Sequence, residues 1–180
     1  MTPLQPDRRR PAADRRRALA RLAPLAWACG ALPAGLTAAL AAPEPVTVRW
    51  PAVSDLDGRP LPAPWLRGNA TLVVFFSTGC AFCARHNARL DGLMQRQPGL
   101  PLTVLLAAQD SPPEGVRQHL ARHGDRFEAT MDSGPLHAAL SPRRVTPLTV
   151  VIDRAGWLRE TIPGEMADDD VRGLARWARS

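Results

Sequence analysis

The feature that most constrains the fold is the stretch Thr71–Leu90, TLVVFFSTGCAFCARHNARL, in which an uncharged apolar run leads directly into two cysteines. Residues 72–76 have the length and the β-branched and aromatic bias of a strand buried on both faces. The small residues 77–79 then interrupt this strand and include residue types that commonly start a helix. The pattern predicts a buried strand followed by a helix, with Cys80 in the first helical turn and Cys83 one turn further on.

This placement gives the two cysteines a chemical role. Backbone N–H groups and the helix dipole favour an anion at a helix N-terminus, so we expect the pKa of Cys80 to be lowered and its thiolate stabilised. A disulfide that closes a two-residue loop restrains little of the unfolded chain. Small exported domains that need disulfides for stability usually carry more of them. The pair Cys80–Cys83 is therefore predicted to be a reactive dithiol/disulfide site.

Positive charge is concentrated at the beginning of the chain. The formal net charge is +6 at pH 7, and the first 21 residues carry seven arginines against two aspartates. The rest of the chain is left with a net charge of about +1 and has no basic stripe with interleaved aromatic residues. The sequence thus gives no support for a nucleic-acid partner.

Residues 18–42, which follow the arginine cluster, are predicted to be an export signal because they are apolar and end in small residues. The alternative is an uncleaved membrane anchor, since the 21 uncharged residues 22–42 are long enough to cross a bilayer. A third cysteine, Cys29, lies in this segment and is interpreted as a passenger. We expect residues 1–42 to be the signal or anchor and residues 43–180 to form one domain.

The remainder of the chain alternates strand and helix patterns. Predicted strands cover residues 71–77, 102–108, 127–131, 148–153 and 157–162. Predicted helices run from Cys80 to about residue 96, and over residues 114–123, 135–140 and 168–179. The order predicts an α/β domain with parallel strands first and an antiparallel hairpin last.

These residues resemble the thioredoxin-like fold, a central mixed sheet flanked by helices with a CxxC pair at the N-terminus of the first long helix. Within that fold they resemble the exported thiol-disulfide oxidoreductases of the TlpA/ResA type. The resemblance covers about residues 54–163 and rests on CAFC at 80–83 and on VTPLTVVIDRAG at 145–156. A lone CxxC would be a weak signal, but its position before this Thr-Pro segment and Gly-containing hairpin is specific.

The resemblance implies roles for individual residues. Cys80 would attack a partner disulfide and Cys83 would resolve the mixed disulfide. Pro147 would be cis and, with Thr146, would form the wall opposite the dithiol and accept an extended partner chain. The dipeptide Ala81-Phe82 would help to set the reduction potential. No cofactor is implied.

The sequence also departs from the family pattern. Gly79 replaces the tryptophan that usually precedes the first cysteine, and Ala88 replaces a proline that kinks the helix. His86 stands where an acid is frequent, three residues after Cys83. A neutral imidazole there would be able to take a proton when Cys83 reacts; the alternative interpretation is a solvated surface histidine.

Two metal-binding interpretations compete with the redox site. Cys80, Cys83 and His86 could together hold Cu(I), which would make the chain a metal-binding module, but the sequence provides no clear fourth ligand. His119 and His123 have zinc-like spacing but lack a neighbouring glutamate, and a solvated helix face explains them better. The prediction is therefore that the chain has no metal site.

The sequence thus predicts an exported thiol-disulfide oxidoreductase, located in the periplasm or an equivalent compartment and either soluble or tethered. Its expected substrates are protein disulfides or thiols, with reduction favoured and a role in maturation of cytochrome c or another metalloprotein implied by the resemblance. A membrane electron-transfer partner would recharge it. The opposite direction, as a thiol oxidase or isomerase, uses the same residues and is the alternative.

Overall fold

The computed structural model describes residues 47–180, and the predicted export segment lies outside this part of the chain. The described residues form one five-stranded mixed sheet with the order β3-β2-β1-β4-β5. The strands are β1 (Ala70–Phe76), β2 (Leu102–Ala108), β3 (Glu128–Thr130), β4 (Leu148–Ile152) and β5 (Leu158–Pro163).

The strand β1 occupies the centre of the sheet. It pairs in parallel with β2 and antiparallel with β4, while β3 and β5 form the two edges. Every residue of β1 is buried, as expected for an apolar strand covered on both faces. The predicted strand-helix-strand unit and the predicted C-terminal hairpin are both confirmed.

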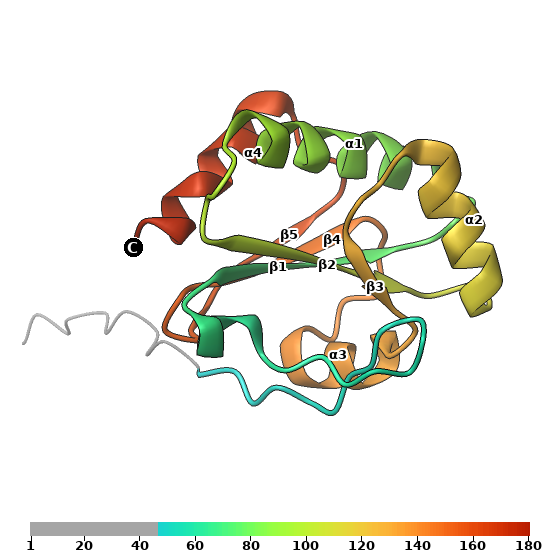
Figure 1. Ribbon diagram of the computed structural model, residues 1–180, viewed down its shortest axis with the longest axis horizontal. Coiled ribbons are helices and arrows are strands. Elements are labelled where there is room, and N and C mark those ends of the chain that lie inside the picture. Colours follow the sequence, from blue (N-terminus) through green and yellow to red (C-terminus); the bar gives the residue numbers. More distant parts are fainter. Residues whose placement is uncertain (1–46) are drawn as a thin grey trace, which may run out of the picture. The chain divides into compact units, whose positions relative to one another are not determined.

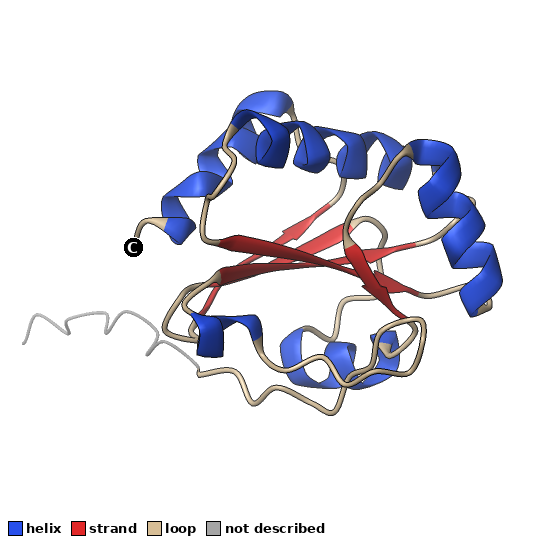
Figure 2. Ribbon diagram, viewed as in Figure 1, coloured by secondary structure: helices blue, strands red, loops and turns tan. Residues whose placement is uncertain are grey.

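Helices cover both faces of the sheet (Figures 1 and 2). On one face lie α1 (Ala81–Arg96), α2 (Pro113–His123) and α4 (Asp168–Gly173), the last continuing as the 3-10 helix η2 (Leu174–Ala178). On the other face lie α3 (Ser133–Leu140), the 3-10 helix η1 (Pro64–Arg67) and the extended segment 47–63 before η1, called the lead-in below. This is the predicted fold class, with the cysteine pair at the start of the first long helix.

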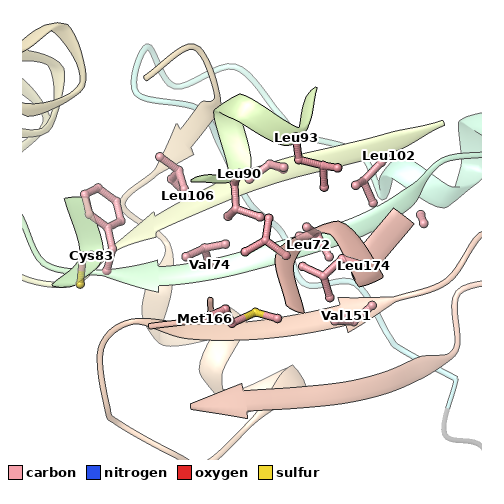
Figure 3. Packing of buried hydrophobic residues seen from close by; sticks show 14 of the residues in the cluster. Leu72, Val74, Cys83, Leu90, Leu93, Leu102, Leu106, Val151, Met166 and Leu174 are labelled. Atoms are coloured by element: carbon pink, nitrogen blue, oxygen red, sulfur yellow. The ribbon is translucent and has the colours of Figure 1, made fainter. Parts of the chain in front are cut away.

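Two apolar clusters form the core, one on each face of the sheet. Figure 3 shows the cluster under α1, where Leu72 and Val74 of β1 meet Leu90 and Leu93 of α1. Cys83 lies at one end of this cluster. The reactive pair is therefore joined directly to the packed interior, because α1 contributes both to the core and to the site.

A few predicted boundaries shift. The helix predicted from residue 135 begins at Ser133, because proline is tolerated in a first turn whose N–H groups have no helical partner. The predicted final helix is α-helical only to Gly173 and then 3-10, a change that coincides with a poor helix former. Ahead of the sheet strands, Thr47 forms one isolated antiparallel bridge with Trp157.

The turn between β4 and β5 anchors the lead-in at the end of the sheet opposite Cys80. The buried carboxylate of Asp153 accepts hydrogen bonds from the backbone N–H groups of Ala155 and Trp157 and forms an ion pair with Arg159. Gly156 has φ +83°, and its carbonyl accepts a hydrogen bond from Val48 N at 2.9 Å. A Cβ at this glycine would lie 2.8 Å from Nε1 of the Trp65 side chain.

We expect Gly156→Ala to destabilise the domain by about 2–4 kcal/mol, because it combines an unfavourable positive φ with overpacking against Trp65. Urea denaturation measures the loss of unfolding free energy. Gly58→Ala is the matched control, since Gly58 has φ +81° but open space around its Cβ position. That control should cost only about 1–2 kcal/mol. Equal losses in the two variants would show that the contact with Trp65 is unimportant.

Candidate active site

The loop that carries the site is held in place at the carboxyl end of β1. The backbone N–H of Thr78 donates to Oδ1 of Asp110 at 3.0 Å, and the Thr78 hydroxyl lies 2.6 Å from the hydroxyl of Ser111. The carbonyl of Ser77 accepts a hydrogen bond from Cys80 N. Gly79 is exposed, and nothing lies within 4 Å of a Cβ built on it. The loop therefore presents Cys80 without a side chain covering it from position 79.

Cys80 and Cys83 form a disulfide, with their Cα atoms 5.2 Å apart. Cys80 is the N-cap residue of α1, and its Sγ accepts a hydrogen bond from the backbone N–H of Cys83 at 3.2 Å. Cys80 is partly exposed, whereas Cys83 is fully buried. Cys80 is thus the more accessible of the two cysteines, and Cys83 is kept behind it.

The electrostatic environment favours an anion on the sulfur of Cys80. The first turn of α1 contains no acidic residue, and the helix dipole places partial positive charge at this terminus. The N–H of Cys83 would remain directed at the sulfur once the disulfide is opened. Such a setting makes an exposed cysteine a good nucleophile and a good leaving group.

The two residues between the cysteines face solvent. Ala81 is exposed, and the side chain of Phe82 is 59% exposed. The guanidinium of Arg85 lies over the Phe82 ring at 4.7 Å from its centroid. The site therefore has an apolar side chain with an adjacent positive charge on its outer surface.

The segment Thr146–Pro147 lies at the same end of the sheet as Cys80, where β1 finishes. Phe75 of β1 pairs with Leu148 of β4, so the residues that precede Leu148 lie where β1 ends. The Thr146–Pro147 peptide bond is cis, and the carbonyl of Pro147 accepts a hydrogen bond from Gly164 N at 2.8 Å. Val145, one residue earlier, is 48% exposed. The two chain segments singled out in the sequence are thus brought to one edge.

His86 is not a surface histidine, so that interpretation of the sequence is wrong. It is fully buried, and its Nδ1 accepts a hydrogen bond from Met166 N at 3.3 Å. Nε2 therefore carries the proton and donates to the hydroxyl of Thr149 at 2.9 Å. Burial, with a contribution from the positive charge of Arg89, lowers the pKa of His86 to about 4. The imidazole is neutral at physiological pH and links α1 to β4 and to the loop after β5.

A residue that the sequence did not single out, Glu165, adds a second link between α1 and this loop. Its carboxylate pairs with Arg85 at 2.8 Å and with Arg89. These hydrogen bonds from the two guanidinium groups lower the pKa of Glu165 to about 2. No local pattern indicates such a contact, because about 80 residues separate Glu165 from the two arginines along the chain.

The candidate metal ligands do not converge. Within residues 47–180, no group of three or more His, Cys, Asp or Glu side chains is placed to hold a metal ion. His86, considered with the cysteines as a Cu(I) ligand, has both ring nitrogens in hydrogen bonds to protein groups. The interpretation of His119 as part of a solvated face is wrong, because it is 1% exposed, whereas His123 is exposed.

Comparisons with known proteins agree with this geometry. No protein-family model matches the chain. Thiol-disulfide oxidoreductase ResA from Bacillus thuringiensis (strain Al Hakam) is 22% identical over 124 residues, which are 69% of this chain and 72% of ResA. ResA from Bacillus anthracis shows the same identity and coverage.

Solved structures show the same fold. A thiol:disulfide interchange protein of the thioredoxin family from Chlorobium tepidum TLS matches with a TM-score of 0.69 and 21% identity, covering 78% of this chain and 100% of that protein. A secreted Mycobacterium tuberculosis disulfide oxidoreductase matches with a TM-score of 0.60 and 18% identity, covering 69% and 93%. Fold, relatives and dithiol together make the chain similar to thioredoxin-like thiol-disulfide oxidoreductases of the TlpA/ResA type.

Proposed function

We propose that this protein is an exported oxidoreductase that reduces disulfide bonds of partner proteins through Cys80 and Cys83. The observation that carries the proposal is the partly exposed Cys80, whose sulfur accepts the N–H of Cys83 at the start of α1, with the second cysteine buried behind it. The export segment supports the location outside the cytoplasm, either free or tethered. No helix within residues 47–180 has the length and apolar character needed to span a membrane.

The reaction is a pair of thiol-disulfide exchanges. The Cys80 thiolate attacks one sulfur of the partner disulfide, which forms a mixed disulfide and releases the other partner sulfur as a thiolate. Cys83, as its thiolate, then attacks the sulfur of Cys80 and releases the second partner thiolate. Both partner thiolates take up protons, two electrons have passed to the partner, and Cys80–Cys83 is left as the disulfide. An external dithiol donor must reduce it again, and a membrane electron-transfer protein would fill that role.

Thr146 and Pro147 are proposed to form the wall against which the partner chain lies. Their placement beside the carboxyl end of β1 supports this role. An extended partner segment would present its disulfide between this wall and Cys80. Val145 adds an exposed apolar side chain next to this wall, and Phe82 adds one on the side of α1.

His86 is proposed to position the dithiol helix, in place of the proton-accepting role considered from the sequence. Both of its ring nitrogens are already in hydrogen bonds, one to Thr149 of β4 and one to Met166 N. Thr149 lies two residues after Pro147, so this contact connects the second turn of α1 with the strand that carries the opposite wall. The imidazole fixes the distance between α1 and the Thr146–Pro147 wall without exchanging protons.

Serine substitutions test the assignment of nucleophile and resolving residue. Cys80→Ser should abolish reduction of an oxidised peptide, because a serine hydroxyl does not attack disulfides at neutral pH. Cys83→Ser should accumulate a stable mixed disulfide with the peptide, visible by mass spectrometry. The opposite pattern, with adducts formed only by Cys80→Ser, would mean that the two roles are reversed.

The direction of electron flow is tested by the reduction potential of the dithiol in the exported domain. We expect a value nearer to that of thioredoxin, about −270 mV, than to the value of about −120 mV typical of strong oxidants. Equilibration with glutathione or dithiothreitol buffers measures it. A strongly oxidising value would favour thiol oxidation of the partner and would rule out the reductase.

The buried neutral His86 predicts an acid-dependent loss of stability. Its pKa falls from 6.5 in the unfolded chain to about 4 in the folded one, so the unfolded chain binds more protons between these values. Lowering the pH from about 6.5 to about 4 should therefore cost up to roughly 3 kcal/mol through this residue. Urea unfolding at a series of pH values should show a smaller loss in His86→Gln than in the wild type.

Two substitutions of His86 separate positioning from bulk stability. A glutamine side chain would keep a group able to donate to Thr149, whereas alanine would not. We expect His86→Ala to slow the resolution of the mixed disulfide, measured at a temperature where both variants are folded, and His86→Gln to restore much of that rate. Equal resolution rates in all three proteins would limit His86 to a structural role.

A further inference from the structure

We propose that the rim of the dithiol site selects partner proteins whose disulfide is flanked by acidic residues. This inference rests on the proposed reduction of protein disulfides and concerns which of them the same site accepts. The surface, called the arginine rim below, consists of the side chains of Arg85, Arg143 and Arg144 together with the exposed Phe82 and Val145. It combines positive charge with apolar contact area on both sides of Cys80.

The sheet register brings the two parts of the arginine rim, one on α1 and one before β4, to the same end of the sheet. Phe82 and Arg85 belong to the first turns of α1, directly after Cys80. Arg143 and Arg144 lie in the loop before β4, which starts opposite Phe75 near the end of β1. The N–H of Arg143 donates to the hydroxyl of Ser141 at 3.3 Å, which ties this loop to the end of α3.

Neither segment that forms the rim contains a carboxylate. Residues 77–90 and residues 133–147 include no aspartate or glutamate. Arg143 and Arg144 are exposed, and in the described part of the chain neither forms an ion pair with a carboxylate. Their charge is therefore open to a partner.

The acidic groups that contact α1 and the loop before it are already engaged. Glu165 pairs with Arg85 and Arg89, and Asp168 pairs with Arg89. Asp110, on the other side of the loop before Cys80, accepts the backbone N–H of Thr78. These carboxylates offset part of the charge of α1 but do not reach the two arginines before β4.

The chain after residue 21 carries a net charge of only about +1, so attraction of an acidic partner depends on where the arginines lie and not on the total charge. A charged patch around a reactive group raises the rate of encounter with partners of opposite charge and disfavours those of like charge. Phe82 and Val145 add exposed apolar area that a free anion would not use. A polypeptide with acidic residues beside its disulfide matches both properties.

The experiment measures the rate at which the reduced protein reduces three disulfide-bridged peptides. The peptides share one cysteine-containing core and differ only in having acidic, neutral or basic flanks. At low ionic strength the acidic peptide should react about tenfold faster than the basic one. The ratio should fall toward one at about 0.5 M salt, because exposed charges are then screened.

Charge reversal locates the effect. The double variant Arg143→Glu/Arg144→Glu should invert the ratio of the acidic to the basic rate. A change in thiolate reactivity would alter both rates alike and cancel in this ratio. The matched control is Arg49→Glu/Arg67→Glu, which changes the net charge by the same amount. These two arginines are exposed at the opposite end of the sheet, so this variant should keep the wild-type ratio.

The possible failures are distinguishable. A ratio near one in the wild type, with the neutral peptide reduced normally, overturns the acidic preference and leaves the proposed function standing. Failure to reduce even the neutral peptide overturns the proposed function itself. An equal change in the control variant attributes the effect to total charge and overturns the rim. If instead the rim variant loses binding to anionic phospholipid vesicles while the wild-type peptide ratio is one, the surface faces a membrane and the proposal is wrong.

Discussion

The central position of β1 is the constraint on which the rest of the structure depends. This strand is buried along its whole length, so both of its edges must be paired and both of its faces covered. Parallel pairing with β2 requires α1 to cross over one face, and this places Cys80 at the N-cap of that helix. Antiparallel pairing with β4 delivers Thr146–Pro147 to the same edge. The position of the site is a consequence of how β1 is paired on both edges and covered on both faces.

The sequence was sufficient for the features that follow from local chemistry. The apolar run before Cys80, the small residues of the loop and the helix pattern after it predicted β1 and α1 almost to the residue. The Asp-Arg-Ala-Gly turn predicted the hairpin in the same way. Each of these elements is determined by residues within a few positions of one another, and a single sequence contains that information.

The sequence was insufficient where the outcome depends on distant partners. The local pattern around His86 suits a surface residue, yet it is buried because Thr149 and Met166, 63 and 80 residues away, satisfy both ring nitrogens. Glu165 goes unnoticed in the sequence for the same reason. His119 packs against Phe76 in the interior, although its spacing to His123 resembled a solvated face. His86 is buried with hydrogen-bond partners that the fold supplies from a distance, whereas within residues 47–180 both ring nitrogens of the buried His119 have no such partner. No local pattern shows either outcome.

The identity of residue 86 also affects the field at the dithiol, and the resemblance of the sequence implies an acid where this chain has His86. A carboxylate at this buried position would oppose ionisation of the nearby cysteines, whereas the imidazole, with its pKa lowered to about 4, adds no charge at neutral pH. Glu165, which lies beside α1, is paired with two arginines. No acidic residue lies in the first turn of α1 to oppose the helix dipole in stabilising the Cys80 thiolate, and a stabilised thiolate makes the disulfide easier to reduce. Relative to a chain with an acid at this position, the substitution therefore shifts the potential of the pair in the oxidising direction.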